Sequence, residues 1–313
     1  MLRHIIRRLL LAIPTLLAVF TVIFIIVRVA PGDPATAVLG DNASQQAVEA
    51  LRERMGLNEP LWKQYLTFLA DLARGDLGDS LKTSQPVWTQ IKSALPHTLE
   101  LTAAALVIGL VVGVPIGVVT AVKRNQAPDY IGRIVSLVGL SLPAFYLAIL
   151  LIYFFAVKLD WFPAVGAPSF SDTGANLHHL VLPAVTLGLI EMAYVARMTR
   201  SVMIAVLSDD YVRTARAKGL GEWVVLVQHA LRAGLIPVVS LVGIFAISMI
   251  GSSVLVEEVF ARPGLGKLMV GATKQKDYTS LQSIMVVYAF IIVIINLITD
   301  IIYTMIDPRV RYA

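Results

Sequence analysis

Four charged residues lie inside otherwise apolar stretches, and they are the first candidates for function in this sequence. They are Arg28, Glu100, Glu191 and Asp300. A charge in an apolar stretch is expensive to bury, so such a residue is expected to reach water, pair with another group or serve a function. Arg28 and Glu100 lie close to the ends of their stretches, where a side chain can extend to the interface and be hydrated. For Asp300, a functional role and a packing or capping role between helices both stay open.

Glu191 lies deeper in its stretch than Arg28 or Glu100 do. Facing a central cavity, its carboxylate would bind an ammonium group or a basic side chain. The alternative is a structural ion pair with an arginine such as Arg197, although residues six apart are poor neighbours on a helix. The sequence leaves both interpretations open.

Two patterns come close to motifs of nucleotide or metal binding, and both lack required residues. Gly266-Lys267 is the only Gly-Lys pair. A phosphate-binding loop needs a first glycine where the chain has Ala261, and Ser or Thr where it has Leu268. His178 and His179 would point about 100° apart on a helix, and no H-E-x-x-H pattern exists. We therefore expect neither a nucleotide site nor a metal site.

The adjacent serines Ser252 and Ser253 suggest an intramembrane serine protease. That chemistry needs a general base, and no histidine lies in a later apolar stretch. A serine in a membrane helix more commonly packs against a neighbouring helix. The chain is therefore not expected to be an enzyme.

The composition indicates the class of protein that contains these residues. The 313 residues are 57% hydrophobic and only 15% charged, and the mean hydropathy is +0.75. These values are typical of an integral membrane protein. The net charge of +5 indicates basic loops rather than nucleic-acid binding. Because the chain has no cysteine, disulfides, zinc-thiolate sites and cysteine nucleophiles are excluded.

A membrane-spanning helix needs about 20 mostly apolar residues, and six stretches qualify. The first is too long for the apolar region of a signal peptide, so we expect it to be retained. The fourth is interrupted by Pro183 and Gly188, which membrane helices tolerate. The six stretches are Leu9–Val29, Leu99–Val122, Ile134–Val157, Leu177–Ala196, Gly234–Val256 and Ser283–Ile306.

Lys and Arg are about twice as dense in the short loops on the side of the N-terminus as in the short loops opposite, which predicts that both termini are cytoplasmic. The predicted division is a first helix within 1–29, an external loop domain over 30–98, a five-helix core over 99–306 and a cytoplasmic tail over 307–313. The external loop is too long to be a simple connector. Within it, an amphipathic stretch runs from Ser44 to Met55.

The inner loop 197–233 contains a short helix with clear boundaries. Ser208 or Asp209 is suited to the N-cap, and Asp210 in the first turn suits the positive end of the helix dipole. Arg216 near the other end suits its negative end. Gly219 stands where a left-handed residue commonly ends a helix.

Tyr211, Val212 and Ala215 fall on one narrow face of this helix. The small alanine side chain would let another surface approach closely. The alternative is an interfacial helix whose basic residues face anionic lipid headgroups. Physical reasoning alone does not decide between them.

The stretch Tyr211–Gly219, YVRTARAKG, resembles the EAA-loop signature of permeases in the dipeptide/oligopeptide/nickel ABC importer family. Other motifs resemble family positions in the same order along essentially the whole chain, as in the first, B-type permease of a pair. They are Arg8-Leu9 with Ile13-Pro14-Thr15, Pro31-Gly32-Asp33-Pro34, Gly75-Asp76-Leu77-Gly78, Pro96–Leu101, Leu182-Pro183-Ala184, Thr186-Leu187-Gly188, Arg197–Arg200, His229–Arg232, Ile236-Pro237, Pro263–Gly266, Asp277-Tyr278 and Asp307-Pro308-Arg309.

Two features depart from the broad EAA consensus. The consensus opens with an acidic residue and two alanines, where this chain has Arg213, Thr214 and Ala215. The consensus proline also lies closer to the glycine than Pro237 does. Both departures are similar to the peptide-class variant of the loop.

The resemblance implies an all-α type I importer fold, with one peripheral helix and a five-helix core, in the bacterial inner membrane. It also implies that the loop helix couples the membrane helices to an ATPase subunit. The coupling residues would be Asp210, Tyr211, Val212, Arg213, Thr214, Ala215, Arg216, Ala217, Lys218 and Gly219. The candidate pathway residues are Glu191, Ser141, Pro143, Met249, Ser252 and Ser253.

The partners implied are a sister permease, two cytoplasmic ATPase subunits that bind ATP and Mg²⁺, and a solute-binding protein. This chain would bind no cofactor itself. An ion-coupled secondary transporter, with Glu191 and Asp300 as coupling groups, is the alternative, but such a protein has no need of the long inner loop with its capped helix. The transported solute is not determined by the sequence.

Overall fold

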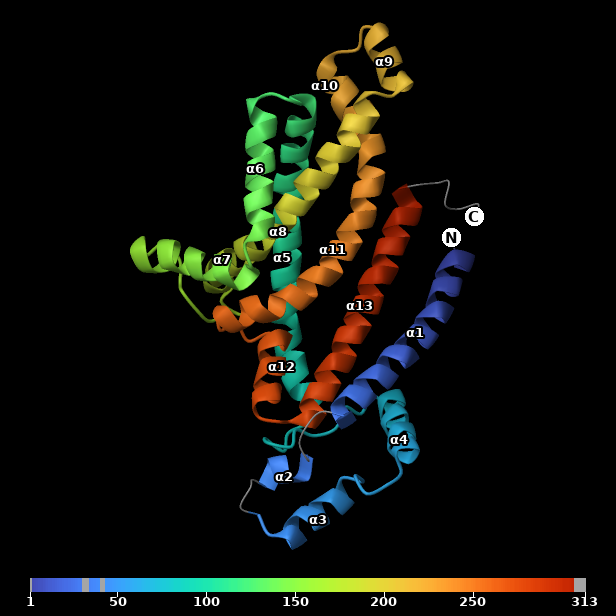
Figure 1. Ribbon diagram of the computed structural model, residues 1–313, viewed down its shortest axis with the longest axis vertical. Helices are drawn as coiled ribbons and strands as arrows, with labels where there is room; N and C mark the ends of the chain where they lie inside the picture. The colour runs from blue at the N-terminus through green and yellow to red at the C-terminus, as the bar shows by residue number, and fades with distance from the viewer. Residues whose placement is uncertain (1, 30–33, 40–42, 307–313) are drawn as a thin grey trace. The chain divides into compact units, whose positions relative to one another are not determined.

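A computed structural model describes residues 2–29, 34–39 and 43–306 (Figure 1). Within these ranges the regular elements are helices, as expected. The Pro31-Gly32-Asp33 motif and the predicted tail 307–313 lie outside the described residues. In chain order the elements are α1 (Leu2–Val29), α2 (Pro34–Leu39), α3 (Gln45–Arg54), α4 (Leu61–Arg74), α5 (Val87–Val122), α6 (Ala127–Ser141), α7 (Ala144–Leu151), the π-helical η1 (Ile152–Lys158), α8 (Thr173–Leu207), α9 (Asp210–Ala217), α10 (Glu222–Val224), the π-helical η2 (Val225–Leu231), α11 (Arg232–Val259), α12 (Leu265–Lys274) and α13 (Tyr278–Ile306).

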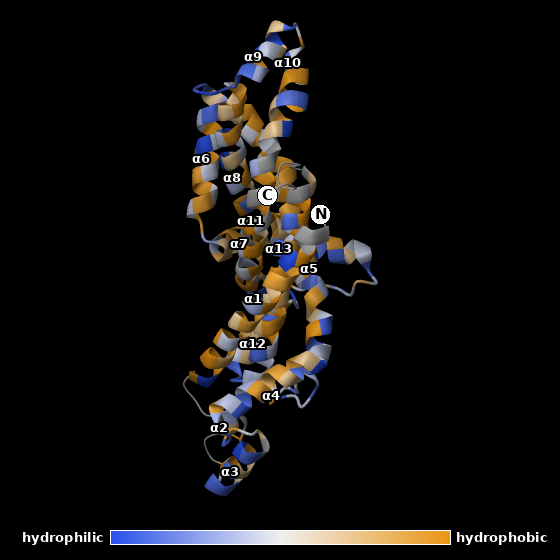
Figure 2. Cartoon of the chain, turned by 90° about the vertical axis from the view of Figure 1, so that its right-hand side faces the viewer, coloured by the Kyte–Doolittle hydropathy of each residue, from blue (hydrophilic) through white to orange (hydrophobic). Residues whose placement is uncertain are grey.

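Five helices are long and apolar enough to cross a membrane: α1, α5, α8, α11 and α13. Figure 2 shows the long helices coloured mainly as hydrophobic. Helices α5 and α8 are longer than the apolar stretches that predicted them, because each continues through polar residues beyond the apolar part. Pro183 lies inside α8 without ending it, as proline in membrane helices is known to do.

The third predicted stretch, 134–157, is not one straight helix. Helix α6 and the α7–η1 segment meet at a bend of 104°. The bend lies at Leu142, whose backbone is extended at φ −88° and ψ 127°, directly before Pro143. A proline ring disfavours helical backbone at the residue before it, so the apolar run is broken at this dipeptide. The chain has six spans if the bent pair is one span.

The chain divides into two compact units, and several helices contribute to both. One unit comprises residues 1–5, 98–262 and 295–313, and the other comprises 6–97 and 263–294. In the second unit, Phe20 and Ile23 of α1 pack with Val286 and Ala289 of α13. Helix α3 has the predicted boundaries, and its N-cap Ser44 accepts a hydrogen bond from the Ala47 amide.

A buried carboxylate joins segments of the second unit that are distant in sequence. Asp277 precedes α13 and accepts a hydrogen bond from the Ser280 amide at 3.1 Å, as an N-cap does. It also accepts bonds from the hydroxyls of Ser80 at 2.6 Å and Ser280 at 2.7 Å, and from the Leu81 amide at 3.2 Å. These four donors satisfy the hydrogen-bonding capacity of the buried carboxylate, as a buried charge requires.

In the first unit, α8 packs against α6, α7 and α11. Three glycines of α5, four residues apart, allow α5 to approach α8 closely. A Cβ atom added at Gly109 would lie 2.5 Å from Glu191 Cγ, at Gly113 2.9 Å from the Met192 carbonyl, and at Gly117 2.5 Å from Thr199 Cβ. Small residues at this spacing are typical of tight helix pairs in membranes.

Candidate functional site

The short helix expected in the inner loop is present as α9. It begins at Asp210 after Asp209, an N-cap residue with extended backbone whose side chain makes no capping hydrogen bond. Its last residue is Ala217, and Gly219, directly after the C-cap Lys218, has φ +77°. The Leu220 amide donates to the Ala215 carbonyl at 3.4 Å, and the Gly219 amide donates to the Arg216 carbonyl at 2.9 Å. These are the two bonds of a Schellman motif.

The face of α9 expected to receive another surface is used largely within the chain. Val212 and Ala215 are buried in a cluster with Met203 of α8 and Val225 of η2. Of the three residues predicted to share that face, Tyr211 alone remains exposed, at 44%. The surface that approaches this face at Val212 and Ala215 therefore belongs to the same chain. Apolar residues at helical spacing indicate a buried face, but they do not indicate whether another protein or the chain itself covers it.

An ion pair closes the turn after α9. The Arg216 guanidinium donates from Nε to Glu222 Oε2 at 3.1 Å and from Nη2 to Oε1 at 2.7 Å. These hydrogen bonds lower the pKa of the Glu222 carboxyl below its usual value. The sequence assigned Arg216 to the helix dipole and missed this partner, because Glu222 lies beyond the turn and not on the helix itself.

The free surface at this end of the unit carries large apolar side chains among basic ones. Trp223 is 76% exposed, and Leu220 and Tyr211 are also exposed. Arg213 and Lys218 of the same loop are also exposed. Figure 1 shows α9 and α10 beyond the ends of α8 and α11. Exposed aromatic residues together with arginine are typical of the residues that dominate binding at protein interfaces.

Glu100 is partly exposed, as its place near the end of its apolar stretch allows, and it also has partners that the sequence did not indicate. It accepts hydrogen bonds from Asn176 Nδ2 at 2.7 Å and from Nη2 of Arg262, whose side chain is fully buried. Buried Glu257 nearby accepts a hydrogen bond from the Thr98 hydroxyl at 2.7 Å. Burial lowers the pKa of Arg262, and the charges of the two carboxylates oppose this effect.

Glu191 is 3% exposed, and its Oε1 atom has no hydrogen-bond partner among the described residues. Its side chain lies against Gly109 of α5. Arg197 is exposed and does not pair with it, so the alternative of an ion pair with that residue is wrong. A buried carboxylate oxygen without a partner is unusual.

The other pathway candidates differ in their surroundings. Met249 is buried in the core cluster with Leu101 and Phe260. Ser253 is buried and donates to the Ile250 carbonyl at 2.8 Å. Ser141, Pro143 and Ser252 are exposed on the surface of the chain. Helix α7, which begins directly after Pro143, packs against α11, which carries Met249, Ser252 and Ser253.

The remaining candidates are Arg28, Asp300 and the two adjacent histidines. The Arg28 guanidinium lies over the Phe24 ring, 5.1 Å from its centroid, and Asp300 is partly buried. His178 and His179 each contact a backbone carbonyl at 2.9 Å. Among the residues that the structure describes, no three His, Cys, Asp or Glu side chains are grouped to hold a metal ion.

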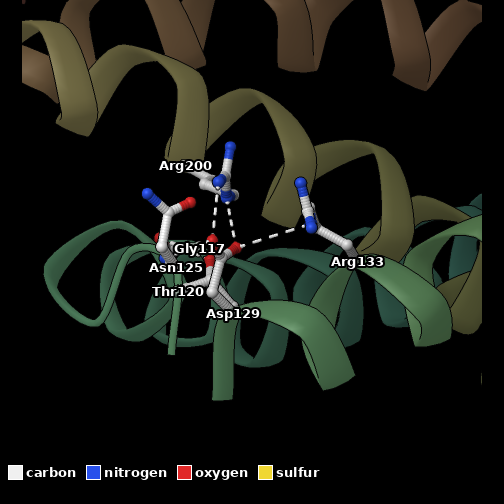
Figure 3. Close-up of polar contacts among 6 residues, drawn as sticks. All are labelled: Gly117, Thr120, Asn125, Asp129, Arg133 and Arg200. Atoms are coloured by element: carbon white, nitrogen blue, oxygen red, sulfur yellow. Dashed lines mark hydrogen bonds and ion pairs between the residues drawn. The ribbon is translucent and has the colours of Figure 1, made fainter. Parts of the chain in front are cut away.

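One ion pair that the sequence did not suggest joins α6 to α8. The Arg200 guanidinium donates from Nε and Nη2 to the two carboxylate oxygens of Asp129, at 2.7 and 2.8 Å (Figure 3). The Asn125 amide also donates to Asp129 at 2.9 Å. A bidentate pair of this kind fixes both distance and orientation.

Five long apolar helices, with the short polar helix α9 between α8 and α11, define a multi-pass helical membrane protein. Two family models match the chain. The model described as binding-protein-dependent transport system inner membrane component matches residues 113–312. A model of the N-terminal part of such membrane components matches residues 1–102. The chain belongs to this family of binding-protein-dependent inner-membrane transport components.

Similar proteins support the same class over the full length. The chain is 43% identical to a dipeptide transport system permease protein of Alkalihalophilus pseudofirmus and 40% identical to a glutathione transport system permease protein of Escherichia coli K12, with all of each chain covered. A chain of the MetNI methionine ABC transporter, solved in an inward-facing conformation, has the same fold. Its TM-score is 0.58 at 20% identity, over 72% of this chain and all of that one.

These findings confirm the predicted class. The chain is a multi-pass inner-membrane permease subunit of an ABC importer, of the dipeptide/oligopeptide type. It is not an enzyme, because its relatives are permease subunits. A permease of this kind works with ATPase subunits and a substrate-binding protein. The secondary-transporter alternative is not favoured.

Proposed function

We propose that this chain forms half of the translocation pathway for short peptides or similar small solutes, together with a sister permease. Helix α9 couples it to a cytoplasmic ATPase subunit, and ATP and Mg²⁺ bind to that subunit. The names of the relatives, which transport dipeptide and glutathione, support a small peptide as the solute. Both termini are cytoplasmic, which the density of Lys and Arg in the loops supports.

The observation that carries the proposal is the construction of α9. Its inner face is fastened to α8 and η2 through Val212 and Ala215, while its outer residues are exposed. A movement imposed on the outer surface is therefore passed to α8, a helix of 35 residues. The surface offered to the ATPase is Tyr211, Leu220 and Trp223 with the basic residues around them, and not the Val212 face.

Glu191 supports the pathway part of the proposal. Its unpartnered Oε1 would be satisfied by a group outside this chain, such as a donor of the sister permease or a solute ammonium. We propose that Glu191 belongs to the translocation pathway with Ser141, Pro143, Met249, Ser252 and Ser253.

The test is co-purification of the ATPase subunits with this chain after expression together with the partner subunits. Trp223→Ala is the variant, and Trp62→Ala is the matched control, since Trp62 is 65% exposed on α4. Removing a central interface aromatic residue costs about 2 kcal/mol, so recovery of the ATPase subunits should fall about 30-fold at limiting concentration. Equal recovery with both variants would refute docking through this surface.

A further inference from the structure

A cavity of about 340 Å³ opens between α5, α6 and α8, and three arginines line it: Arg133, Arg197 and Arg200. The rest of its lining is mixed. Apart from Gly132, it consists of two hydroxyl side chains and a set of aliphatic ones. These are Thr120, Ser136, Ile116, Leu137, Leu140 and Ala196. A basic rim beside an aliphatic wall is suited to a ligand with an anionic head and an apolar tail.

The charges at this cavity do not cancel. Asp129, which is fully buried, takes two hydrogen bonds from Arg200 and so neutralises it. Arg133 Nε lies 3.9 Å from the same carboxylate, and its side chain is half exposed (Figure 3). Its guanidinium also lies over the Tyr130 ring, 4.8 Å from the centroid. Three guanidinium groups against one carboxylate leave two positive charges.

Arg197 supplies one of the two uncompensated charges. It is exposed, and it has no hydrogen-bond or ion-pair partner in residues 2–29, 34–39 and 43–306. It lies three residues before Arg200 on α8, so both side chains are on the same side of the helix. Arginine presents several donors in a fixed plane that matches the oxygens of a phosphate.

The depth of these arginines suits a lipid headgroup. With 35 residues, α8 is about 52 Å long, against a hydrocarbon core of about 30 Å. A centred α8 would extend about 11 Å, or about seven residues, beyond the core at each end. Arg200 is seven residues before the last residue, Leu207, and therefore lies at the boundary. Arg197 lies one turn deeper, from where its long side chain reaches the interface.

We propose that this cavity binds an anionic phospholipid. Arg133 and Arg197 hold the phosphate, and Ile116, Leu137 and Leu140 contact the start of an acyl chain. Basic pockets between membrane helices are suited to such headgroups. The Asp129–Arg200 pair has a separate role: it fixes α6 to α8 and so keeps the walls of the site at a constant separation.

The experiment uses the full chain in a neutral detergent, with lipid binding measured by native mass spectrometry. The probes are phosphatidylglycerol, phosphatidylcholine and inorganic phosphate. The variants are Arg197→Gln and Arg133→Gln. Arg124→Gln is the matched control, because Arg124 is an exposed arginine near α6 that does not line the cavity. No ATPase or transport is involved, so this result is independent of the proposed transport function.

We expect phosphatidylglycerol to bind at least about tenfold more tightly than phosphatidylcholine. Each cavity arginine should contribute about fivefold and the double variant about 25-fold, whereas Arg124→Gln should change affinity by less than about twofold. Equal binding of the two lipids by the wild-type chain would overturn the proposal, even if a variant failed to fold. So would losses in the cavity variants no larger than in the control. Displacement of the lipid by equimolar inorganic phosphate would instead identify a free-anion site and refute the lipid.

Discussion

Replacing Gly219 by valine tests whether the turn after α9 controls coupling. Gly219 has φ +77°, and a Cβ atom placed there would have no heavy atom within 4 Å. The substitution therefore meets no steric obstacle from neighbours, and its whole effect comes from the backbone. A left-handed conformation costs a residue with a side chain about 1–2 kcal/mol, and a β-branched residue is a genuine outlier there.

The interactions that stabilise the native turn contribute a free energy similar to this penalty. Its two Schellman hydrogen bonds are at the surface and contribute about 1 kcal/mol each. The Arg216–Glu222 pair is about half exposed, so it adds about 0.5 kcal/mol. A penalty of 2 kcal/mol or more from valine nearly cancels this sum of about 2.5 kcal/mol. The native turn and other conformations of the loop should then have nearly equal free energies. Alanine, at about 1 kcal/mol, should leave it dominant.

Gly221 provides the control, because it also has open space around its Cβ position but has φ −62° and ψ 144°. A β-branched residue such as valine favours this extended backbone conformation. We expect Gly219→Val to lower solute uptake several-fold in proteoliposomes containing the whole importer. ATP hydrolysis should also stop responding to the loaded binding protein. Gly219→Ala should have a small effect and Gly221→Val almost none, with equal membrane levels of all three variants. Equal transport by Gly219→Val and Gly221→Val would refute the role assigned to this turn.

Three further predictions concern the helix packing and the buried charges. Gly113→Ala should lower the free energy of unfolding of the detergent-purified chain by about 1–3 kcal/mol, and with it the unfolding temperature, because the added Cβ would meet α8. Gly251→Ala is the control: its Cβ has open space around it, so the change should be neutral or slightly stabilising. A larger loss in Gly251→Ala than in Gly113→Ala would contradict the close α5–α8 contact. Glu100→Gln should lower the free energy of unfolding by about 2 kcal/mol, because buried Arg262 then has one carboxylate fewer. Adding Arg262→Gln to this variant should recover part of the loss. Strictly additive effects of the two substitutions on the unfolding free energy would show that the two groups are not coupled. Glu191→Gln should change the transport KM for free-amine peptides more than for N-acetylated ones, with the complex assembled normally; identical kinetics for both would leave Glu191 a structural role only.

Features set by neighbours in the sequence were predictable. The apolar stretches predict the long helices because a helix in lipid must be apolar over about 20 residues. Gly219 predicted the end of α9 because the need for a left-handed residue is local. The break at Leu142 could have been found in the same way, since the next residue is Pro143. The α5 glycines at a spacing of four were also a usable signal for a tight helix pair.

Pairings between distant residues were not predictable. Asp129 and Arg200 are 71 residues apart, and Glu100 and Arg262 are 162 apart. A carboxylate in a sequence of this kind has many arginines available, and only the packing of the helices selects one. The same limit applies to α9: periodicity placed Val212 and Ala215 on one face, but it did not identify the surface of the same chain that covers them.

These distant contacts bear on how α9 could act. Its inner face packs on Met203, close to the end of α8. One turn before Met203, Arg200 is bound in a bidentate pair to Asp129 of α6, and further along α8 the side chains of Val195 and Glu191 lie against glycines of α5. Close-packed contacts of this kind transmit displacement because neither partner can yield by repacking a gap. A force on the exposed surface of α9 would therefore move α5, α6 and α8 together, and a flexible α9 would lose that force before it reached Glu191.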